Sequence, residues 1–184
     1  MLNFSIWQMA DKFSKEIRHK CMSSIPAKNT GPELKLRNAL WRLGFRYRVN
    51  VKQLPGSPDI VLPKYRTVIF VHGCFWHGHK DCKNASTPKT NTDFWTAKIT
   101  RNQERDQEVW RQLEAKGWSV IIVWECQLKK AVLDETIARV EAEILRNGEQ
   151  HHREKEERKA SRIAYQQEQK ARKEREAAYL TEIK

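Results

Sequence analysis

The sequence predicts an α/β domain in which helices flank a mixed central sheet, followed by a charged C-terminal extension. Three observations predict it: an amphipathic helical pattern beginning at Thr30, a hairpin pattern over residues 59–71, and a long helical pattern leading into the apolar run Ser119–Trp124. We expect the order helix, three strands, helix, strand. The 184 residues divide into an N-terminal segment (1–29), a domain (30–147) and a tail (148–184).

The first helix has a clear start signal. Thr30-Gly-Pro-Glu33 combines an N-cap residue, an early proline and a carboxylate three residues after the cap. The helix should run to about Leu43, where Gly44 ends it. One face would carry Glu33, Leu36, Leu40 and Leu43. Glu33 is therefore expected near the core, either as a capping carboxylate, as a metal-site acid, or as both.

The strands are expected from alternation and turn residues. Residues 45–49 alternate apolar and basic side chains, as a half-buried strand does. Residues 59–62 and 67–71 flank a turn at 63–66 and predict a hairpin. Its simplest register sets Asp59 opposite Phe70 or Val71.

A second helix is predicted from Thr92 to Lys116, closed by Gly117, with Asp106 on its inner side. The apolar run Ser119–Trp124 that follows is typical of a central strand covered on both faces. A helical crossover between strands favours a parallel pair. Beyond residue 147, abundant Glu, Lys, Arg and Gln with few large apolar residues predict a solvated helix or a disordered tail.

The charge balance favours a polyanionic partner. Lys and Arg total 35 against 23 Asp and Glu, a net charge of +12, which points first to nucleic acid. An acidic membrane surface is the alternative, but no run approaches the roughly 20 apolar residues of a spanning helix. The N-terminus shows no export signal, so we expect a soluble protein in a reducing compartment, where cysteines suggest metal before disulfide.

A metal constellation stands out between residues 72 and 82, where three histidines and two cysteines follow a predicted strand. If the strands before Cys74 and Cys126 are parallel, both cysteines leave the sheet at the same end. The predicted Cys3His zinc shell is Cys74, His79, Cys82 and Cys126. The alternative is ordinary buried thiols and polar loop histidines. Cys21 has no metal-like companion and is expected to be a free thiol.

A closed zinc shell leaves the remaining acids and imidazoles for chemistry. They are Glu33, Asp59, His72, His77 and Asp106, together with the main chain near Val71. This set suits magnesium-dependent phosphodiester cleavage, with a carboxylate and a carbonyl on the metal and a neutral histidine activating water. The alternatives are that Asp59 caps a turn and that Asp106 pairs with Arg105 or Arg101.

Four segments resemble the very-short-patch repair endonucleases. They are Leu54-Pro-Gly-Ser-Pro-Asp59 with Val68-Ile-Phe-Val-His-Gly-Cys-Phe-Trp-His77, Phe94-Trp95, and Val123-Trp-Glu-Cys126. The resemblance covers about residues 14–130 and implies a restriction-endonuclease-like fold. It also implies an enzyme that nicks DNA on the 5′ side of the thymine in a T:G mismatch left by deamination of 5-methylcytosine.

The resemblance also implies roles for individual residues. Asp59 would bind Mg²⁺ directly, the main-chain carbonyl at Val71 would reach the metal, and Glu33 would act through water. His77 would be the catalytic histidine, with Asp106 as its orienting partner and His72 as a second active-site histidine. The same four residues, Cys74, His79, Cys82 and Cys126, carry over as zinc ligands.

DNA contacts are implied as well. Phe75, Trp76 and Trp95 would insert from the major groove beside the mismatch, and Met22 and Ile25 from the minor groove, in the N-terminal DNA-contacting segment. Lys98 is a further expected DNA contact. Core packing is the alternative for the aromatic residues. A mismatch weakens stacking and so lowers the cost of opening a base step.

Three features depart from the family's pattern. Val71 stands at a position where threonine is expected, which matters little if only the main-chain carbonyl binds metal. His79 and Cys82 are separated by two residues, which makes the zinc loop longer than expected. The usual PD-(D/E)xK motif of such nucleases is incomplete, because Pro58-Asp59 is not followed by an acid and a lysine on the second hairpin strand. The histidines must then take the place of that lysine.

The expected partner is mismatched double-stranded DNA, with other mismatch-repair proteins as further candidates. We expect a monomeric, cytoplasmic, nucleoid-associated bacterial protein with no membrane partner. Two other functions stay open: a zinc-stabilised DNA-binding module without catalysis, and a related nuclease of different specificity.

Overall fold

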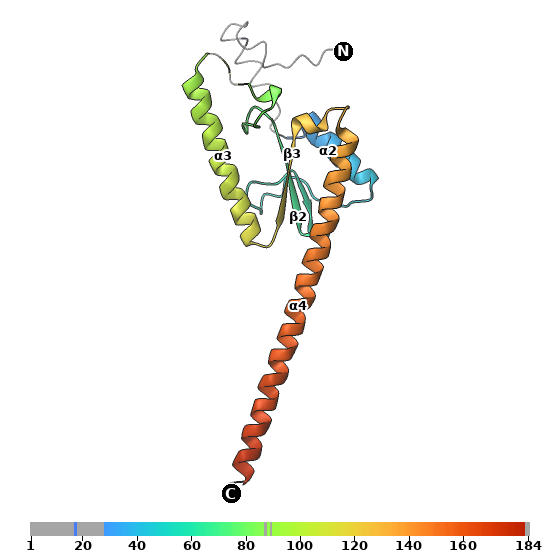
Figure 1. Ribbon diagram of the computed structural model, residues 1–184, viewed down its shortest axis with the longest axis vertical. Coiled ribbons are helices and arrows are strands. Elements are labelled where there is room, and N and C mark those ends of the chain that lie inside the picture. The colour runs from blue at the N-terminus through green and yellow to red at the C-terminus, as the bar shows by residue number, and fades with distance from the viewer. Residues whose placement is uncertain (1–16, 18–27, 87, 89, 183–184) are drawn as a thin grey trace.

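The computed structural model describes residue 17, residues 28–86, residue 88 and residues 90–182. Figure 1 shows a small sheet with helices on both sides and one long helix that extends away from it. The predicted minor-groove residues Met22 and Ile25, and the thiol of Cys21, lie outside the described residues. Within the described part, no helix is both long and apolar enough to cross a membrane.

Helix α2 (Gly31–Arg42) begins where the sequence predicts. Thr30 and Glu33 form the capping box, and Gly44, at φ +88°, follows the helix end. Leu36 and Leu40 are fully buried, whereas Leu43 is 44% exposed. The expectation that Leu43 faces the core was wrong, because it is the C-cap residue, where the helical twist that would place it on the inner face ends.

The hairpin is confirmed. Strands β1 (Ile60–Leu62) and β2 (Thr67–His72) pair antiparallel across the short 3-10 helix η2 (Pro63–Tyr65), with Ile60 opposite Ile69. The same register continued by one residue sets Asp59 opposite Phe70. The expected strand over residues 45–49 is absent from the described sheet, where only an isolated bridge joins Arg48 to Val61.

Strand β3 (Ser119–Trp124) runs parallel to β2, with His72 beside Trp124 at the shared carboxyl end. The described sheet has the order β1-β2-β3, so β2 is its central strand and β3 lies at an edge. The prediction of a central position for residues 119–124 was wrong. Continuous apolar character reflects cover on both faces and does not require a strand neighbour on both sides.

Helices cover both faces of the sheet. On one face, α2 and α4 (Leu133–Glu182) bury Leu40 and Ile144 against Ile69. On the other, α3 (Thr92–Ala115) packs Leu113 against Phe70. The result is three layers, with the sheet in the middle, as the sequence predicts for an α/β domain.

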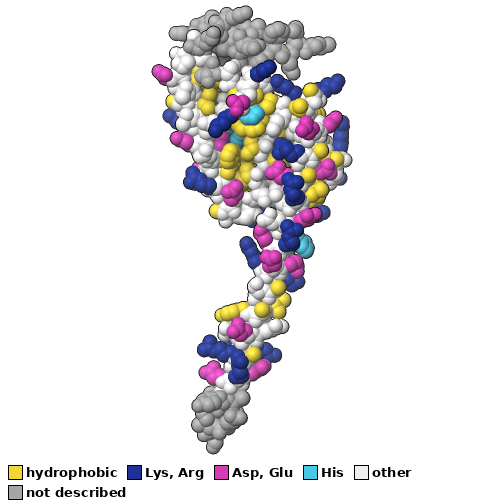
Figure 2. Space-filling model, viewed as in Figure 1, with side chains coloured by type: hydrophobic (Ala, Val, Ile, Leu, Met, Phe, Trp, Pro, Cys, Tyr) yellow, Lys and Arg dark blue, Asp and Glu magenta, His cyan; other side chains and the backbone are white. Residues whose placement is uncertain are grey.

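Helix α4 is a single 50-residue helix. Its first part belongs to the domain, since the Asn147 amide donates to Thr67 Oγ1 at 3.3 Å and Gly148 lies against the Tyr65 ring. Between residues 156 and 176 the side chains are largely exposed, with Tyr165 63% accessible, and Figure 2 shows mixed positive and negative charge along this part. The described part of the tail is helical, and the helix continues through the predicted boundary at residues 147 and 148 without a break.

Two short 3-10 helices complete the described structure. The first, η3 (Lys83–Ala85), follows the histidine-rich loop, and the second, η4 (Glu125–Leu128), follows β3 and contains Cys126. Both therefore lie at the end of the sheet where β2 and β3 terminate. This end carries the candidate site.

Candidate active site and metal centre

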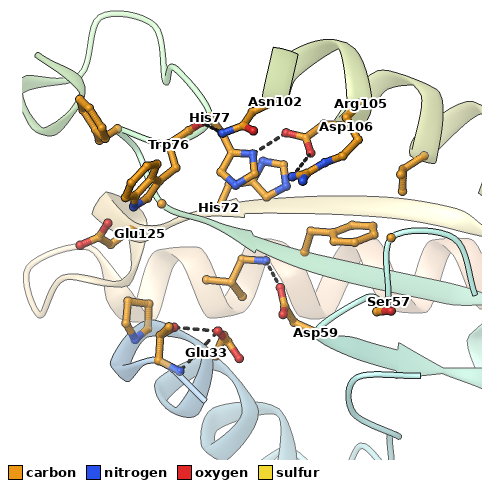
Figure 3. Close-up of a pocket in the computed structure, with 18 of the residues that line it drawn as sticks. Glu33, Ser57, Asp59, His72, Trp76, His77, Asn102, Arg105, Asp106 and Glu125 are labelled. Atoms are coloured by element: carbon orange, nitrogen blue, oxygen red, sulfur yellow. Dashed lines mark hydrogen bonds and ion pairs between the residues drawn. The ribbon is translucent and has the colours of Figure 1, made fainter. Parts of the chain in front are cut away.

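A cleft of about 850 Å³ opens at the carboxyl end of β2, between the start of α2 and the middle of α3. Figure 3 shows Glu33 on α2 and Asp106 on α3, on opposite sides of the strand end, with Asp59 and His72 between them. The candidate catalytic residues that line the cleft are Glu33, Asp59, His72, His77 and Asp106, together with Val71. All six predicted positions therefore converge on one site.

Asp59 is fixed to the neighbouring strand. The Val71 N–H donates to Asp59 Oδ2 at 2.8 Å, in keeping with the predicted register. Burial raises the pKa of Asp59 to about 6, and the nearby Glu33 carboxylate adds to the increase, while the Val71 N–H and the charges of Arg37 and His77 oppose it. A cation bound beside such a carboxylate would stabilise its ionised form.

Glu33 carries out the capping role in full. Its Oε1 accepts from Thr30 Oγ1 at 2.9 Å, and its Oε2 accepts from the Asn29 N–H and from Arg37 Nη2, each at 3.0 Å. Because both oxygens already have donors, Glu33 fits an indirect, water-mediated contact to a metal better than direct ligation. The capping alternative is confirmed, and it leaves the second role open.

Arg37 joins the two acids and was missed by sequence reasoning. This guanidinium, 5% exposed, binds Glu33 Oε2 at 3.0 Å, the Asp59 main-chain oxygen at 2.9 Å and Asn29 Oδ1 at 2.6 Å. The signal was available, because Arg37 lies four residues after Glu33, on the same helix face. Its buried charge offsets part of the repulsion between the two carboxylates.

The two histidines are stacked. The rings of His72 and His77 lie 3.7 Å apart at 15°, and His77 Nδ1 is hydrogen-bonded to Asp106 Oδ2. Helix α3 also holds the loop main chain, since Asn102 donates to the Trp76 carbonyl at 2.9 Å and Gln103 to the His77 carbonyl at 3.1 Å. Asp106 points inward as predicted, and it binds both His77 and Arg105.

The pKa values of this group separate the roles of its members. Burial lowers the pKa of His72 to about 3, so its ring is neutral at physiological pH. For Asp106, burial alone would raise the pKa, but the hydrogen bond from His77 and the charges of His77 and Arg105 lower it below the ordinary value. An ionised Asp106 therefore accepts from Nδ1–H of His77, which leaves Nε2 of His77 as an acceptor for a proton.

Ligand atoms of His72, His77 and Asp106 lie within 4.8 Å of one another. Imidazole lone pairs lie in the ring plane, so two nearly parallel rings do not direct their lone pairs at one ion. His72 Nδ1 is buried without a hydrogen-bond partner in the described structure. This arrangement fits proton transfer and hydrogen bonding better than metal ligation.

A second cluster contains the four predicted zinc ligands. The donor atoms of Cys74, His79, Cys82 and Cys126 all lie within 4.8 Å of one another, and the described cysteines form no disulfide. Burial raises the pKa of the Cys74 thiol to about 12. Three thiols and an imidazole packed this closely match the donor set of a closed tetrahedral site. The long loop fits because Asp81 adopts a left-handed conformation, φ +55°.

The aromatic residues form one cluster, of which Phe75 and Trp76 line the cleft. The ring centre of Phe75 lies 5.3 Å from that of Trp76 and 5.2 Å from that of Trp95, and the ring centres of Phe94 and Trp95 are 5.1 Å apart. Phe75 is 2% exposed, as the core-packing alternative expects, whereas Phe94, which sequence reasoning left out of the DNA contacts, is 58% exposed. The Lys98 ammonium lies 6.0 Å from the ring centres of both Trp76 and Phe94.

Comparison with known proteins agrees with this geometry. A family model described as DNA mismatch endonuclease Vsr matches residues 10–84. The type II nicking enzyme V.NmeAIP of Neisseria meningitidis is 50% identical over 137 residues, 74% of this chain and 97% of that protein. The chain belongs to the Vsr family of DNA endonucleases.

Two further Vsr-family relatives are similar. The type II nicking enzyme V.XorIIP of Xanthomonas oryzae is 48% identical over 120 residues, 65% of this chain and 88% of the relative. The DNA mismatch endonuclease Vsr of Escherichia coli is 46% identical over 121 residues, 66% of this chain and 77% of the relative. The protein is thus an endonuclease that hydrolyses DNA, and a binding module without catalysis is not favoured.

Proposed function

We propose that this Vsr-family enzyme uses magnesium to nick one strand of duplex DNA on the 5′ side of the thymine in a T:G mismatch. The observation that carries the proposal is the convergence of the Asp59 carboxylate and the His77–Asp106 pair on one cleft. A structural protein has no need for an acid with a raised pKa facing an oriented imidazole.

His77 is the proposed general base. Ionised Asp106 fixes the ring through Nδ1, so that Nε2 accepts a proton from the attacking water. The water oxygen forms a bond to phosphorus, and the bond from phosphorus to the leaving sugar oxygen breaks. A second proton, from solvent, ends on that sugar oxygen, which gives one phosphate monoester and one hydroxyl end.

His72 is the proposed second active-site histidine. Because its pKa is lowered to about 3, the ring is neutral and offers one N–H donor without adding a charge. The stack on His77 holds both rings in place. A neutral donor beside the phosphate would stabilise negative charge as it develops.

Asp59, the Val71 carbonyl and, through water, Glu33 are the proposed residues that hold Mg²⁺. The donor set is all oxygen, as magnesium prefers, and the raised pKa of Asp59 signals an acid that a cation would stabilise. When bound, magnesium supplies a positive charge to phosphate oxygens and to the attacking water. Val71 has no side-chain hydroxyl, so only its main chain could serve.

Zinc is the proposed ion of the cysteine and histidine cluster, with a structural role. Cys74 and His79 belong to the loop that carries His77, while Cys126 belongs to η4 after β3. An ion at this cluster would tie the loop to the end of the sheet. The position of His77 therefore depends on a site that does no chemistry itself.

The proposed substrate contacts lie around the aromatic cluster. Trp76 and Trp95, with Phe94 beside them, are placed to stack on an opened base step, and Lys98 to contact the backbone. Phe75 is buried, so it would contact DNA only if the aromatic cluster opens. Met22 and Ile25 remain proposed minor-groove contacts. We also propose that the protein acts as a cytoplasmic, nucleoid-associated monomer, with other mismatch-repair proteins as partners.

Strand-resolved cleavage of a mismatched duplex library tests the proposal. With magnesium, T:G duplexes should be nicked in the thymine strand only, and matched T:A duplexes should stay intact. Calcium or EDTA in place of magnesium should abolish the nick. Equal cleavage of matched and mismatched duplexes would reject mismatch specificity and favour a related nuclease with another target.

A further inference from the structure

The charge of the cleft is unusual for a site that must admit DNA. Its lining includes four carboxylates, Glu33, Asp59, Asp106 and Glu125, and among the described lining residues the one lysine or arginine is Arg105. A phosphodiester carries a negative charge and would be repelled by this lining. The net charge of +12 acts over the whole chain and does not supply a cation inside the cleft.

Arg105 is placed to supply that cation. It lies on α3 directly before Asp106, and Figure 3 shows its side chain at the same side of the cleft as His77, across from Asp59. Its side chain is 65% accessible, and Nη2 lies 3.5 Å from Asp106 Oδ1. This single contact leaves other N–H donors of the guanidinium available to a ligand.

The ion pair also aims the side chain. Asp106 Oδ2 binds His77 and Asp106 Oδ1 binds Arg105, so one carboxylate anchors both the proposed base and the guanidinium. A phosphate beside the His77 ring would therefore have Arg105 on the same side of the cleft. Two parallel N–H donors match two phosphate oxygens, and this geometry is specific to arginine.

We infer that Arg105 is a catalytic residue that binds the non-bridging oxygens of the phosphate being cleaved. It would offset the repulsion from the four carboxylates in the bound state and stabilise the additional negative charge in the transition state. The inference rests on the proposed nuclease site and adds a protein cation on the side of the phosphate away from Asp59.

A phosphate scan in the absence of divalent metal tests the contact without cleavage. Duplexes would carry one neutral methylphosphonate at a time around the mismatch, and binding would be measured for wild type, Arg105→Gln and Arg111→Gln. Arg111 is the matched control, because it lies on the same helix, its side chain is 71% accessible, it pairs with Glu108 at 3.1 Å, and it does not line the cleft. Both variants lose one positive charge.

The inference predicts that one methylphosphonate position weakens binding by wild type and by Arg111→Gln about tenfold but leaves Arg105→Gln unchanged. That position should be the phosphate that magnesium-activated enzyme cleaves. If the Arg105→Gln variant responds to every position as the control does, Arg105 does not contact a single phosphate and the inference fails.

Single-turnover cleavage gives the second readout. Arg105→Gln should lower the cleavage rate of bound DNA about 10²-fold or more, Arg105→Lys should restore part of the rate because it keeps the charge without the fork, and Arg111→Gln should stay within a few-fold of wild type. An Arg105→Gln rate equal to that of Arg111→Gln would overturn the catalytic role.

The two proposals fail in different ways. If wild-type enzyme nicks no mismatched duplex, the proposed function fails, and the scan still reports whether Arg105 contacts one phosphate. If wild type nicks the T:G duplex and the scan shows no position dependent on Arg105, the nuclease site stands and the Arg105 contact is wrong.

Discussion

At the scale of single residues, the site places carboxylates in opposite environments. Asp59 is held with a pKa raised to about 6, mainly by burial, whereas Asp106 has a lowered pKa because of its hydrogen bond to His77. Separation of this kind lets one acid await a cation while the other stays ionised and orients a base. Each state follows from which groups lie beside the carboxylate.

The raised pKa of Asp59 predicts a pH-dependent cost to stability. Because the folded-state pKa of about 6 lies above the ordinary pKa of 3.8, the stability that Asp59 contributes is fully present below about pH 3.8 and is lost as the pH rises through 6. Without added magnesium, the melting temperature of Asp59→Asn minus that of wild type should therefore increase by a few degrees from pH 5 to pH 8. Thermal unfolding at both pH values measures this, and a difference that does not grow with pH would contradict it.

The pairing of His77 with Asp106 predicts coupled losses. His77→Ala should lower the cleavage rate of bound DNA by about 10²–10⁴-fold. Asp106→Asn should also lower it, because an amide no longer holds the ring in the required tautomer. The double variant should be little slower than His77→Ala alone, since both act through one group. Strictly multiplicative losses in single-turnover cleavage would show that Asp106 acts by another route.

At the scale of elements, local signals predicted most of what builds the site. The capping box at Thr30, the register that sets Asp59 opposite Phe70, and the inward face of α3 at Asp106 were all confirmed. Each depends on residues close in sequence or on one regular period. The parallel pairing of β2 with β3, which brings Cys126 to the loop, was also predicted correctly.

The features that the sequence did not predict depend on tertiary contacts, which no local sequence pattern specifies. Residues 45–49 have strand-like alternation but make only an isolated bridge in the described structure, because a strand requires a partner as well as a pattern. The central place of β2, the link from Arg37 to both acids, and the stacked histidines are products of tertiary packing.

The loop that carries His77 should depend on the metal cluster. Cys126→Ser is expected to release the bound zinc and to destabilise the fold, because a structural ion contributes folding free energy directly. Zinc content by elemental analysis and thermal unfolding measure both effects. Cys21→Ser, at a thiol predicted to be free, is the control and should keep its zinc. Unchanged zinc stoichiometry in Cys126→Ser would remove Cys126 from the shell.

At the scale of the whole molecule, the three-layer domain and the projecting helix are distinct in character. The domain buries Leu40, Ile69 and Ile144 in one core, while the helix is largely exposed over residues 156–176. The V.NmeAIP relative is matched over 97% of its length by 137 residues of this chain. Sequence composition predicted the solvated character of the tail, but it left open whether the tail is helical.

The exposed part of α4 should be dispensable for folding and for nicking. A chain ending after residue 159 keeps the contacts of Asn147 and Gly148 with the sheet and η2. We expect its melting temperature to stay within about 2 °C of the full chain, since surface changes away from packed contacts have small effects. Its nicking rate should also be unchanged. A large loss of either would show that the tail contributes to the domain or to DNA binding.

The proposed function depends on one catalytic centre, formed by the acid at the start of the hairpin and the paired imidazoles beside it. Its most direct test is strand-resolved nicking of a T:G duplex by Asp59→Ala, with zinc content and duplex binding measured on the same preparation. We expect nicking to be abolished while zinc content and DNA binding stay close to wild type. Magnesium-dependent nicking retained at the wild-type rate would contradict it.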